Sequence, residues 1–250
     1  MGDWFLSWSG GADSTAAGIL CVEHGLPLKA VVYCEVMFDR EISGEVPEHR
    51  DFIYNIGIPW FESHGVPVIV LRSEKTALDW MLSEVKTGPR KGKLHGFPLS
   101  GNQGWCSVKR DCKLNVLERF RKEHPDARYY EGICKDEEAR IKEDKLLAGC
   151  YPLVDLGYSQ QGARWLCDDY GLLSPVYEFT KRGGCFFCPN ARDSELHHLY
   201  HHHPDLWSRL MEIQNMENVV RPGYFRVDEN LHDIESRFYL ADNQFSLFGK

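Results

Sequence analysis

The stretch Trp4-Phe5-Leu6-Ser7-Trp8-Ser9-Gly10-Gly11-Ala12-Asp13-Ser14 decides the fold that the sequence predicts. An apolar run over residues 4–6 leads into a glycine pair and then into a helical pattern over residues 13–24. The two glycines allow a tight turn that brings backbone N–H groups close to an anion. The helix N-terminus adds about half a positive charge, and Ser9 and Ser14 add hydroxyl groups. The stretch is therefore typical of a phosphate-binding turn, although a Gly-rich turn capped by Ser and Asp remains an alternative.

Strand-like and helix-like segments alternate along the chain beyond this turn. The expected strands cover residues 4–6, 30–34, 66–71, 128–130 and 151–154. The expected helices cover residues 13–24, 47–56, 76–85, 107–124 and 159–170. Strands separated by helices imply right-handed βαβ units and a parallel sheet, so we expect an α/β fold.

The composition agrees with a soluble globular chain and carries one unusual charge pattern. The 250 residues are 43% hydrophobic and 26% charged, with a net charge of −8, which argues against a general nucleic-acid coat protein. Ten basic and three acidic residues between Glu84 and Lys122 give that segment a net charge of +7. Such a segment suggests that the protein binds an anionic substrate at one place. A solvated basic helix face next to a loop would explain the charges equally well. Phe97 and Trp105 lie among these cations and could stack on a base.

The sequence favours a reducing, cytoplasmic setting. Its apolar runs fall short of the 18 or so residues of a transmembrane helix, and its start lacks the pattern of a secretory signal. Nine cysteines are an odd number, so we expect reduced thiols. Four cysteines stand alone in apolar surroundings and are expected in the core: Cys21, Cys34, Cys150 and Cys167.

Cys185 and Cys188 form a Cys-x-x-Cys turn after two glycines and before Pro189. Such a turn can aim two thiolates at one metal, and the alternatives are a redox dithiol or cysteines without metal. A His-rich helix and a polar tail follow. His197 and His201 are one helical turn apart and could chelate, but a solvated helix end is the favoured interpretation.

The segment Ser9-Gly10-Gly11-Ala12-Asp13-Ser14 resembles the SGGxDS motif of the PP-loop ATP pyrophosphatases. Four further segments, in order, resemble the PAPS-reductase-like branch: Trp105-Cys106 with Lys113, residues 132–140, residues 151–153, and residues 184–189. The last segment resembles the closing turn of phage-type members and of the DNA-phosphorothioation sulfurtransferase. The resemblance covers about residues 3–190, and it departs from the family where Cys134 replaces a usual Arg.

The resemblance implies an adenine nucleotide alpha-hydrolase-like fold. This is a doubly wound, mostly parallel five-stranded sheet over residues 1–180, followed by the metal turn and a helical C-terminal extension over residues 181–250. It implies ATP with Mg²⁺ as cofactor. The residues expected to bind the nucleotide are Ser7, Ser9, Gly10, Gly11, Ala12, Asp13, Ser14, Tyr33 and Lys109. Those expected to act in catalysis are Asp13, Lys113, Glu137 and Arg140.

The resemblance also implies a metal centre on Cys106, Cys185 and Cys188, with Cys112 as a further candidate. Three cysteines would hold a [4Fe-4S] cluster with one open iron for sulfide, whereas four closed ligands would favour a structural Zn²⁺.

The expected activity is binding of ATP, or of an adenylyl sulfonucleotide, adenylation of a substrate with release of pyrophosphate, and sulfur transfer with help from the Cys-ligated metal centre. The expected partners are an adenine nucleotide, a nucleic-acid or small-molecule sulfur acceptor, and a sulfur donor or reductant protein. We expect no membrane partner, and a homodimer is a further candidate. One alternative is a PAPS or APS reductase, which needs a nucleophilic cysteine near the C-terminus, whereas no cysteine follows Cys188. The other is a non-catalytic accessory subunit that binds nucleotide or nucleic acid and carries structural zinc.

Overall fold

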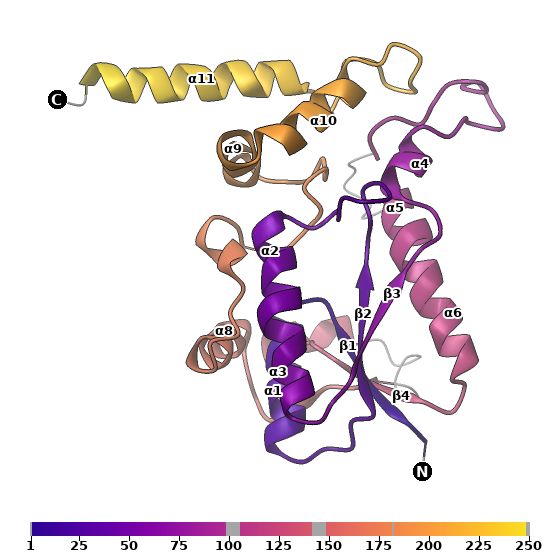
Figure 1. Ribbon diagram of the computed structural model, residues 1–250, viewed down its shortest axis with the longest axis vertical. Coiled ribbons are helices and arrows are strands. Elements are labelled where there is room, and N and C mark those ends of the chain that lie inside the picture. The colour runs from indigo at the N-terminus through magenta and orange to yellow at the C-terminus, as the bar shows by residue number, and fades with distance from the viewer. Residues whose placement is uncertain (1, 99–105, 142–148, 182, 249–250) are drawn as a thin grey trace. The chain divides into compact units, whose positions relative to one another are not determined.

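The computed structural model describes residues 2–98, 106–141, 149–181 and 183–248 (Figure 1). Its sheet has five strands: β1 (Trp4–Trp8), β2 (Ala30–Glu35), β3 (Val68–Arg72), β4 (Arg128–Glu131) and β5 (Gly149–Cys150). The strand order is β3-β2-β1-β4-β5, and every neighbouring pair is parallel. The predicted α/β fold with a parallel five-stranded sheet is confirmed.

Helical segments connect the strands and form the C-terminal part. Those before β4 are α1 (Ala12–Glu23), α2 (Pro47–Phe52), the π turn η1 (Ile53–Gly57), α3 (Ile58–Ser63), α4 (Ala77–Met81), α5 (Ser107–Lys109), the π turn η2 (Arg110–Leu114) and α6 (Asn115–Glu123). Those after β4 are the 3₁₀ segment η3 (Lys135–Arg140), α7 (Pro152–Asp155), α8 (Gln160–Asp169), the 3₁₀ segment η5 (Pro175–Glu178), α9 (Asp193–His202), α10 (Pro204–Gln214) and α11 (Leu231–Phe248). The polar tail expected after the His-rich helix is therefore itself helical.

Helices cover both faces of the sheet, because the central strands carry apolar side chains on both faces and these must be buried. Leu6 and Trp8 of β1 pack with α1 and α3 in one cluster of buried residues. Phe5, the residue just before Leu6, packs with Phe120 of α6 in another. Alternate residues of a strand point to opposite faces, so β1 lies in the middle of an α/β/α arrangement, as Figure 1 shows for α1, α3 and α6.

The strand predicted at residues 151–154 is wrong. Pro152 begins the short helix α7 there, and the last strand lies just before it, at Gly149–Cys150. Proline is favoured in the first turn of a helix, where its missing N–H is not needed. The apolar residue Leu153 is fully buried beside α1, which explains why the segment is apolar without being a strand.

The chain folds into two compact units, each assembled from three separate segments. The first unit comprises residues 1–35, 45–73 and 113–183 and contains the sheet. The second comprises residues 36–44, 74–112 and 184–250. The chain crosses from the first unit to the second for the last time between residues 183 and 184. The domain boundary expected between residues 180 and 181 lies close to this point, and it stays a prediction.

The Cys-x-x-Cys turn packs against another segment of the second unit. Phe186 and Phe187, the two residues inside the turn, are buried, and their ring centroids lie 4.9 and 5.6 Å from that of Phe38. The backbone N–H of Phe186 donates to the Gly44 carbonyl at 2.9 Å. The turn is thereby anchored to the loop that follows β2.

The hypothesis that Phe97 stacks on a base is wrong. The Phe97 side chain is buried, and its ring packs edge-on against Phe225 at 4.8 Å between centroids. Trp105, the other aromatic residue proposed for stacking, lies outside the described residues. Within the described part of the chain, no helix combines the length and apolar composition needed to cross a bilayer.

Candidate nucleotide site

The turn between β1 and α1 is closed by hydrogen bonds between its own serines. The Ser14 hydroxyl accepts from the Ser9 N–H at 3.2 Å and donates to the Gly11 carbonyl at 3.0 Å. The hydroxyl oxygens of Ser9 and Ser14 lie 3.1 Å apart. The serines therefore hold the loop in shape, in addition to the ligand-binding role predicted from the sequence.

Position 10 accommodates only glycine. Its φ is +73°, in the left-handed region that disfavours other residues. A Cβ at this position would lie 2.8 Å from Ile53 and 2.9 Å from the imidazole of His49. The same imidazole lies 3.2 Å from the Ser9 carbonyl and 2.8 Å from the Ser174 hydroxyl. The buried His49 thus fixes the back of the loop, a role that the sequence did not reveal.

The first turn of α1 presents backbone amides. Gly11 is the N-cap residue and supplies no side-chain cap, so the simple capped-turn alternative does not describe this helix end. The Ala12 N–H donates to the Tyr177 hydroxyl at 2.8 Å. No described residue accepts a hydrogen bond from the Asp13 or Ser14 N–H. Two amides at a positive helix end are therefore available to an anion.

The end of β4 lies against this turn. A Cβ on Gly132 would lie 2.5 Å from the Ser14 nitrogen and 2.6 Å from the Asp13 carbonyl carbon. Real Cβ atoms essentially never approach backbone atoms this closely, so only glycine fits. The close approach brings the carboxyl ends of β1 and β4 together.

A pocket of about 430 Å³ opens at this place. It is lined by Ser7, Trp8, Ser9, Ser14, Cys34, Lys113, Leu114, Leu117, Glu118, Arg121, Glu131, Gly132, Ile133 and Arg140, all from the first unit. The strand order places β2 on one side of β1 and β4 on the other. Open α/β sheets bind ligands at such a switch point, outside the carboxyl ends of the strands.

Cations from two segments line the pocket. Lys113 is half-buried, and no carboxylate among the described residues lies within ion-pair distance of its ammonium group. Arg121 is paired with Glu131 at 2.9 Å. Arg140 of η3 is paired with Glu137. Lys113 therefore has its charge available for an anionic ligand, whereas the two arginines are partly neutralised.

Asp13 lies in an environment unfavourable to its charge. Burial raises its pKa above the usual value, and the Glu137 carboxylate raises that pKa further. A hydrogen bond from the Cys134 thiol acts in the opposite direction. Cys134 is fully buried, and its thiol holds the Asp13 carboxylate. Neither Asp13 nor Glu137 lines the pocket itself, and two carboxylates that repel each other are a donor set that a divalent cation such as Mg²⁺ can neutralise.

The other predicted nucleotide residues are placed as follows. Tyr33 is fully buried, with its ring centroid 5.8 Å from that of Trp8, so its ring belongs to the core. Lys109 is exposed and belongs to the second unit. Beside the end of β2, the Cys34 thiol donates to the Lys113 carbonyl at 3.8 Å, and burial raises its pKa to about 11.

A buried carboxylate stabilises the end of β2. Glu35 is fully buried and accepts a hydrogen bond from the Tyr54 hydroxyl at 2.7 Å. Arg72 of β3 lies 2.7 Å from the same carboxylate, and Arg50 lies 3.6 Å from it. The network joins two strands and α2, and it keeps the strand ends in register beside the pocket.

The four predicted metal-binding cysteines all belong to the second unit. Cys188 N–H donates to the Cys185 carbonyl at 3.0 Å, which closes the turn, and both side chains are partly exposed. Cys106 is also partly exposed and accepts from the Lys109 N–H at 3.4 Å, whereas Cys112 is fully buried. No three ligand atoms that include a cysteine sulfur lie within 4.8 Å of one another in the described residues. The Cys185 and Cys188 turn fits two thiolate ligands, and the full ligand set stays a prediction.

No protein-family model matches the chain, and no curated protein matches it. Among solved structures, it is similar to a phosphoadenylyl-sulfate (PAPS) reductase from Candida auris in a phosphate complex, with 10% identity over 74% of this chain and 82% of that chain and a TM-score of 0.48. It is also similar to the U34-tRNA thiolase NcsA from Methanococcus maripaludis with its [4Fe-4S] cluster, with 15% identity over 86% and 71% of the two chains and a TM-score of 0.44. At these scores the two likenesses carry no functional argument.

Proposed function

We propose that the chain is a PAPS-reductase-like PP-loop enzyme that binds ATP, adenylates a substrate and transfers sulfur to it. The observation that carries the proposal is the open helix end at Asp13 and Ser14 beside the pocket that Lys113 lines. Backbone amides, a helix dipole and one lysine without a carboxylate partner among the described residues are what a polyphosphate requires.

The nucleotide step follows from the charges around the pocket. An oxygen of the substrate attacks the α-phosphorus of ATP, the bond to the β-phosphate oxygen breaks, and pyrophosphate leaves. Lys113 and the amides of α1 would stabilise the negative charge that develops on the leaving pyrophosphate. Asp13 and Glu137 would hold Mg²⁺ against the phosphates, and Arg140, already paired with Glu137, would orient that carboxylate.

The sulfur step is the part that rests on the resemblance. Hydrosulfide displaces AMP: its sulfur forms the bond to the substrate carbon as the carbon–oxygen bond breaks, and AMP leaves with that oxygen. Cys185 and Cys188, with Cys106 or Cys112, would hold the [4Fe-4S] cluster, or alternatively Zn²⁺. When bound, a cluster with one open iron supplies a place for sulfide.

The first test is nucleotide binding by isothermal titration of the full chain. We expect ATP and pyrophosphate to bind and AMP to bind more weakly, because most contacts of the site are made to phosphates. Lys113→Ala should weaken ATP binding about tenfold or more, the usual effect of losing one charge-assisted hydrogen bond. Lys29→Ala is the matched control because Lys29 is exposed and paired with Asp3, and neither residue lines the pocket.

A pyrophosphate-release assay then tests catalysis. The full chain is incubated with ATP, Mg²⁺ and candidate acceptors such as bulk tRNA or DNA. Pyrophosphate release that needs an acceptor and is lost in Lys113→Ala supports the proposal. ATP affinity that is equal in Lys113→Ala and Lys29→Ala would overturn the assignment of the site.

A further inference from the structure

Two histidines of α9 and one aspartate of α11 bring three possible metal ligands together in the second unit. The Nε2 atoms of His197 and His201 are 3.1 Å apart. Each faces one oxygen of the Asp242 carboxylate, His197 at 3.2 Å and His201 at 2.9 Å. The three residues come from two helices and form a site apart from the cysteines.

These distances match those between ligands of one small metal ion. Zinc binds imidazole nitrogen and carboxylate oxygen at about 2.0–2.2 Å. Two such ligands at angles between 90° and the tetrahedral value are separated by about 2.9–3.5 Å. All three measured separations lie close to or within this interval.

Without a metal, the carboxylate is satisfied only when both imidazoles carry their proton on Nε2. A neutral imidazole carries one N–H, so each Nε2 is either a donor or a bare lone pair. If both Nε2 atoms carry a proton, two N–H groups lie side by side 3.1 Å apart. If one Nε2 atom is unprotonated, its lone pair faces a carboxylate oxygen. A divalent cation between the three groups accepts both nitrogen lone pairs and neutralises the carboxylate.

The fold holds α11 beside α9 by means that do not need the metal. Phe238 lies one helical turn before Asp242, and its ring centroid is 5.0 Å from that of His197 and 6.0 Å from that of Tyr200. The Trp207 indole N–H of α10 donates to Glu235 of α11 at 3.0 Å. The third ligand is therefore held in place by packing.

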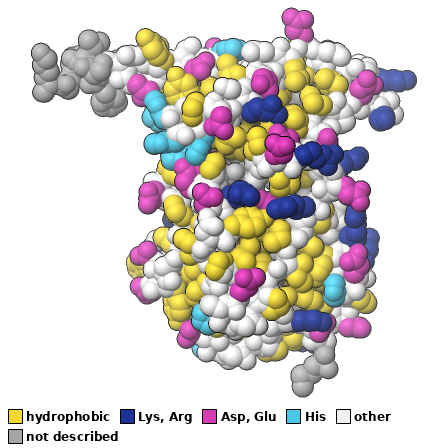
Figure 2. Space-filling view, viewed as in Figure 1, with side chains coloured by type: hydrophobic (Ala, Val, Ile, Leu, Met, Phe, Trp, Pro, Cys, Tyr) yellow, Lys and Arg dark blue, Asp and Glu magenta, His cyan; other side chains and the backbone are white. Residues whose placement is uncertain are grey.

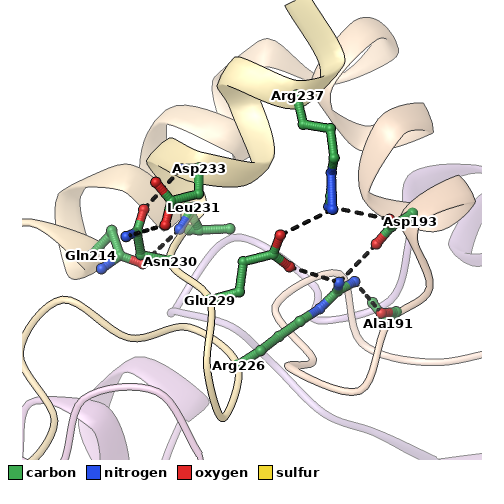
Figure 3. A network of polar contacts seen from close by, with 9 residues as sticks. All are labelled: Ala191, Asp193, Gln214, Arg226, Glu229, Asn230, Leu231, Asp233 and Arg237. Carbon is green, nitrogen blue, oxygen red and sulfur yellow. Dashed lines mark hydrogen bonds and ion pairs between the residues drawn. The ribbon is translucent and has the colours of Figure 1, made fainter. Parts of the chain in front are cut away.

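A network of ion pairs fixes the start of α11 (Figure 3). Arg237 lies 3.1 Å from Asp193 and 3.0 Å from Glu229. Arg226 contacts the same two carboxylates, at 2.7 and 3.1 Å. Since Asp193 opens α9 and Arg237 belongs to α11, the network and the histidines join the two helices at two separate places.

The site is open to solvent. The side chains of His197, His201 and Asp242 are 43%, 38% and 38% exposed, and Figure 2 shows histidine side chains gathered in one patch over α9. Two imidazoles and one carboxylate favour Zn²⁺ and its transition-metal neighbours over Mg²⁺ or Ca²⁺, which prefer oxygen ligands alone. Three protein ligands leave further positions to water.

We propose that His197, His201 and Asp242 bind one divalent transition-metal ion, Zn²⁺ by their donor chemistry, and that the ion cross-links α9 to α11. This inference is independent of the nucleotide site. It assigns the His-rich helix a ligand role in place of the solvated helix end that the sequence favoured.

The test is a Zn²⁺ titration of the full chain against a chromophoric chelator. The variants are His197→Ala/His201→Ala and, as a change that preserves shape, Asp242→Asn. His202→Ala is the matched control, because His202 is exposed on the same helix and lies outside the trio. All variants keep the cysteines, so any Zn²⁺ that the cysteines bind is the same in every protein and does not affect the comparison.

We expect the wild type and His202→Ala to bind one Zn²⁺ more than the double variant, and Asp242→Asn to bind that ion at least tenfold more weakly. Zn²⁺ should also slow amide hydrogen exchange in α11 of the wild type and not in the double variant. Equal zinc stoichiometry and affinity in all four proteins would overturn the proposal. An equal loss in His202→Ala would also overturn it, since it would indicate an unspecific histidine patch.

Discussion

Replacing Gly132 with alanine tests the junction between the end of β4 and the turn before α1. The new Cβ would lie 2.5 Å from the Ser14 nitrogen, whereas an ordinary contact begins at 3.4 Å. The backbones must therefore separate by about 0.9 Å. The close atoms belong to the backbone at Asp13 and Ser14, so no side-chain rotation relieves the overlap. Overpacking of this kind costs about 1–3 kcal/mol.

The overlap displaces the backbone amides of Asp13 and Ser14, which we propose bind the phosphates of ATP. We expect the melting temperature to fall by about 2–12 °C, since 1 kcal/mol corresponds to about 2–4 °C for a chain of this length. We expect ATP affinity to fall at least about tenfold, within the range of about 5- to 150-fold that 1–3 kcal/mol represents. Differential scanning fluorimetry and isothermal titration measure the two quantities.

Gly162→Ala is the matched control. A Cβ on Gly162 would meet Tyr158 at 3.4 Å, an ordinary contact, and the position lies inside α8, where alanine is favoured. If Gly132→Ala and Gly162→Ala have the same melting temperature and the same ATP affinity, the approach of the two backbones is refuted. If only stability falls and ATP affinity is unchanged, the turn does not bind the phosphates.

Three further predictions concern stability, thiol chemistry and activity. Glu35→Gln should lower stability by about 1–3 kcal/mol relative to Glu62→Gln in urea unfolding, because the neutral amide loses the ion pairs that the buried carboxylate makes with Arg72 and Arg50, whose side chains are 49% and 44% exposed. Burial raises the pKa of Cys21 to about 12 and that of Cys34 to about 11, from an ordinary value of 9.0. The native state then holds protons that the unfolded state loses, so stability should fall as pH rises from 9 toward 12, and unchanged urea midpoints between pH 8.5 and 10.5 would contradict this. A phosphosulfate reduction assay with thioredoxin should be negative, because no cysteine follows the Cys-x-x-Cys turn, and sulfite production would favour the reductase alternative.

Local patterns predicted most of the sheet and the turn between β1 and α1. The strands around Leu6 and Val32 were recognisable because a strand buried on both faces is a short continuous apolar run. The turn at residues 9–14 was recognisable because its residues are neighbours in the sequence. The strand predicted at residues 151–154 failed because an apolar run with Pro152 at its start satisfies a helical first turn equally well.

The parts that the sequence did not reveal are contacts between distant segments. Tyr177 reaches the Ala12 amide across 165 positions, and Gly132 is required by the backbone of α1 rather than by its own surroundings in the chain. Asp242 completes the ligand trio from a helix that looked like a polar tail. Each of these depends on packing between elements, which periodicity and motif spacing do not encode.

The repeated passage of the chain between the two compact units constrains how the protein can be made. The second unit needs residues 36–44, 74–112 and 184–250, so it cannot be completed on the ribosome until the last of these segments has emerged. Until then Phe38 lacks Phe186 and Phe187, and this aromatic surface stays exposed in the nascent chain. Neither unit can be obtained by one truncation, and a nascent chain halted before residue 184 would be a natural client for chaperones that bind exposed aromatic segments.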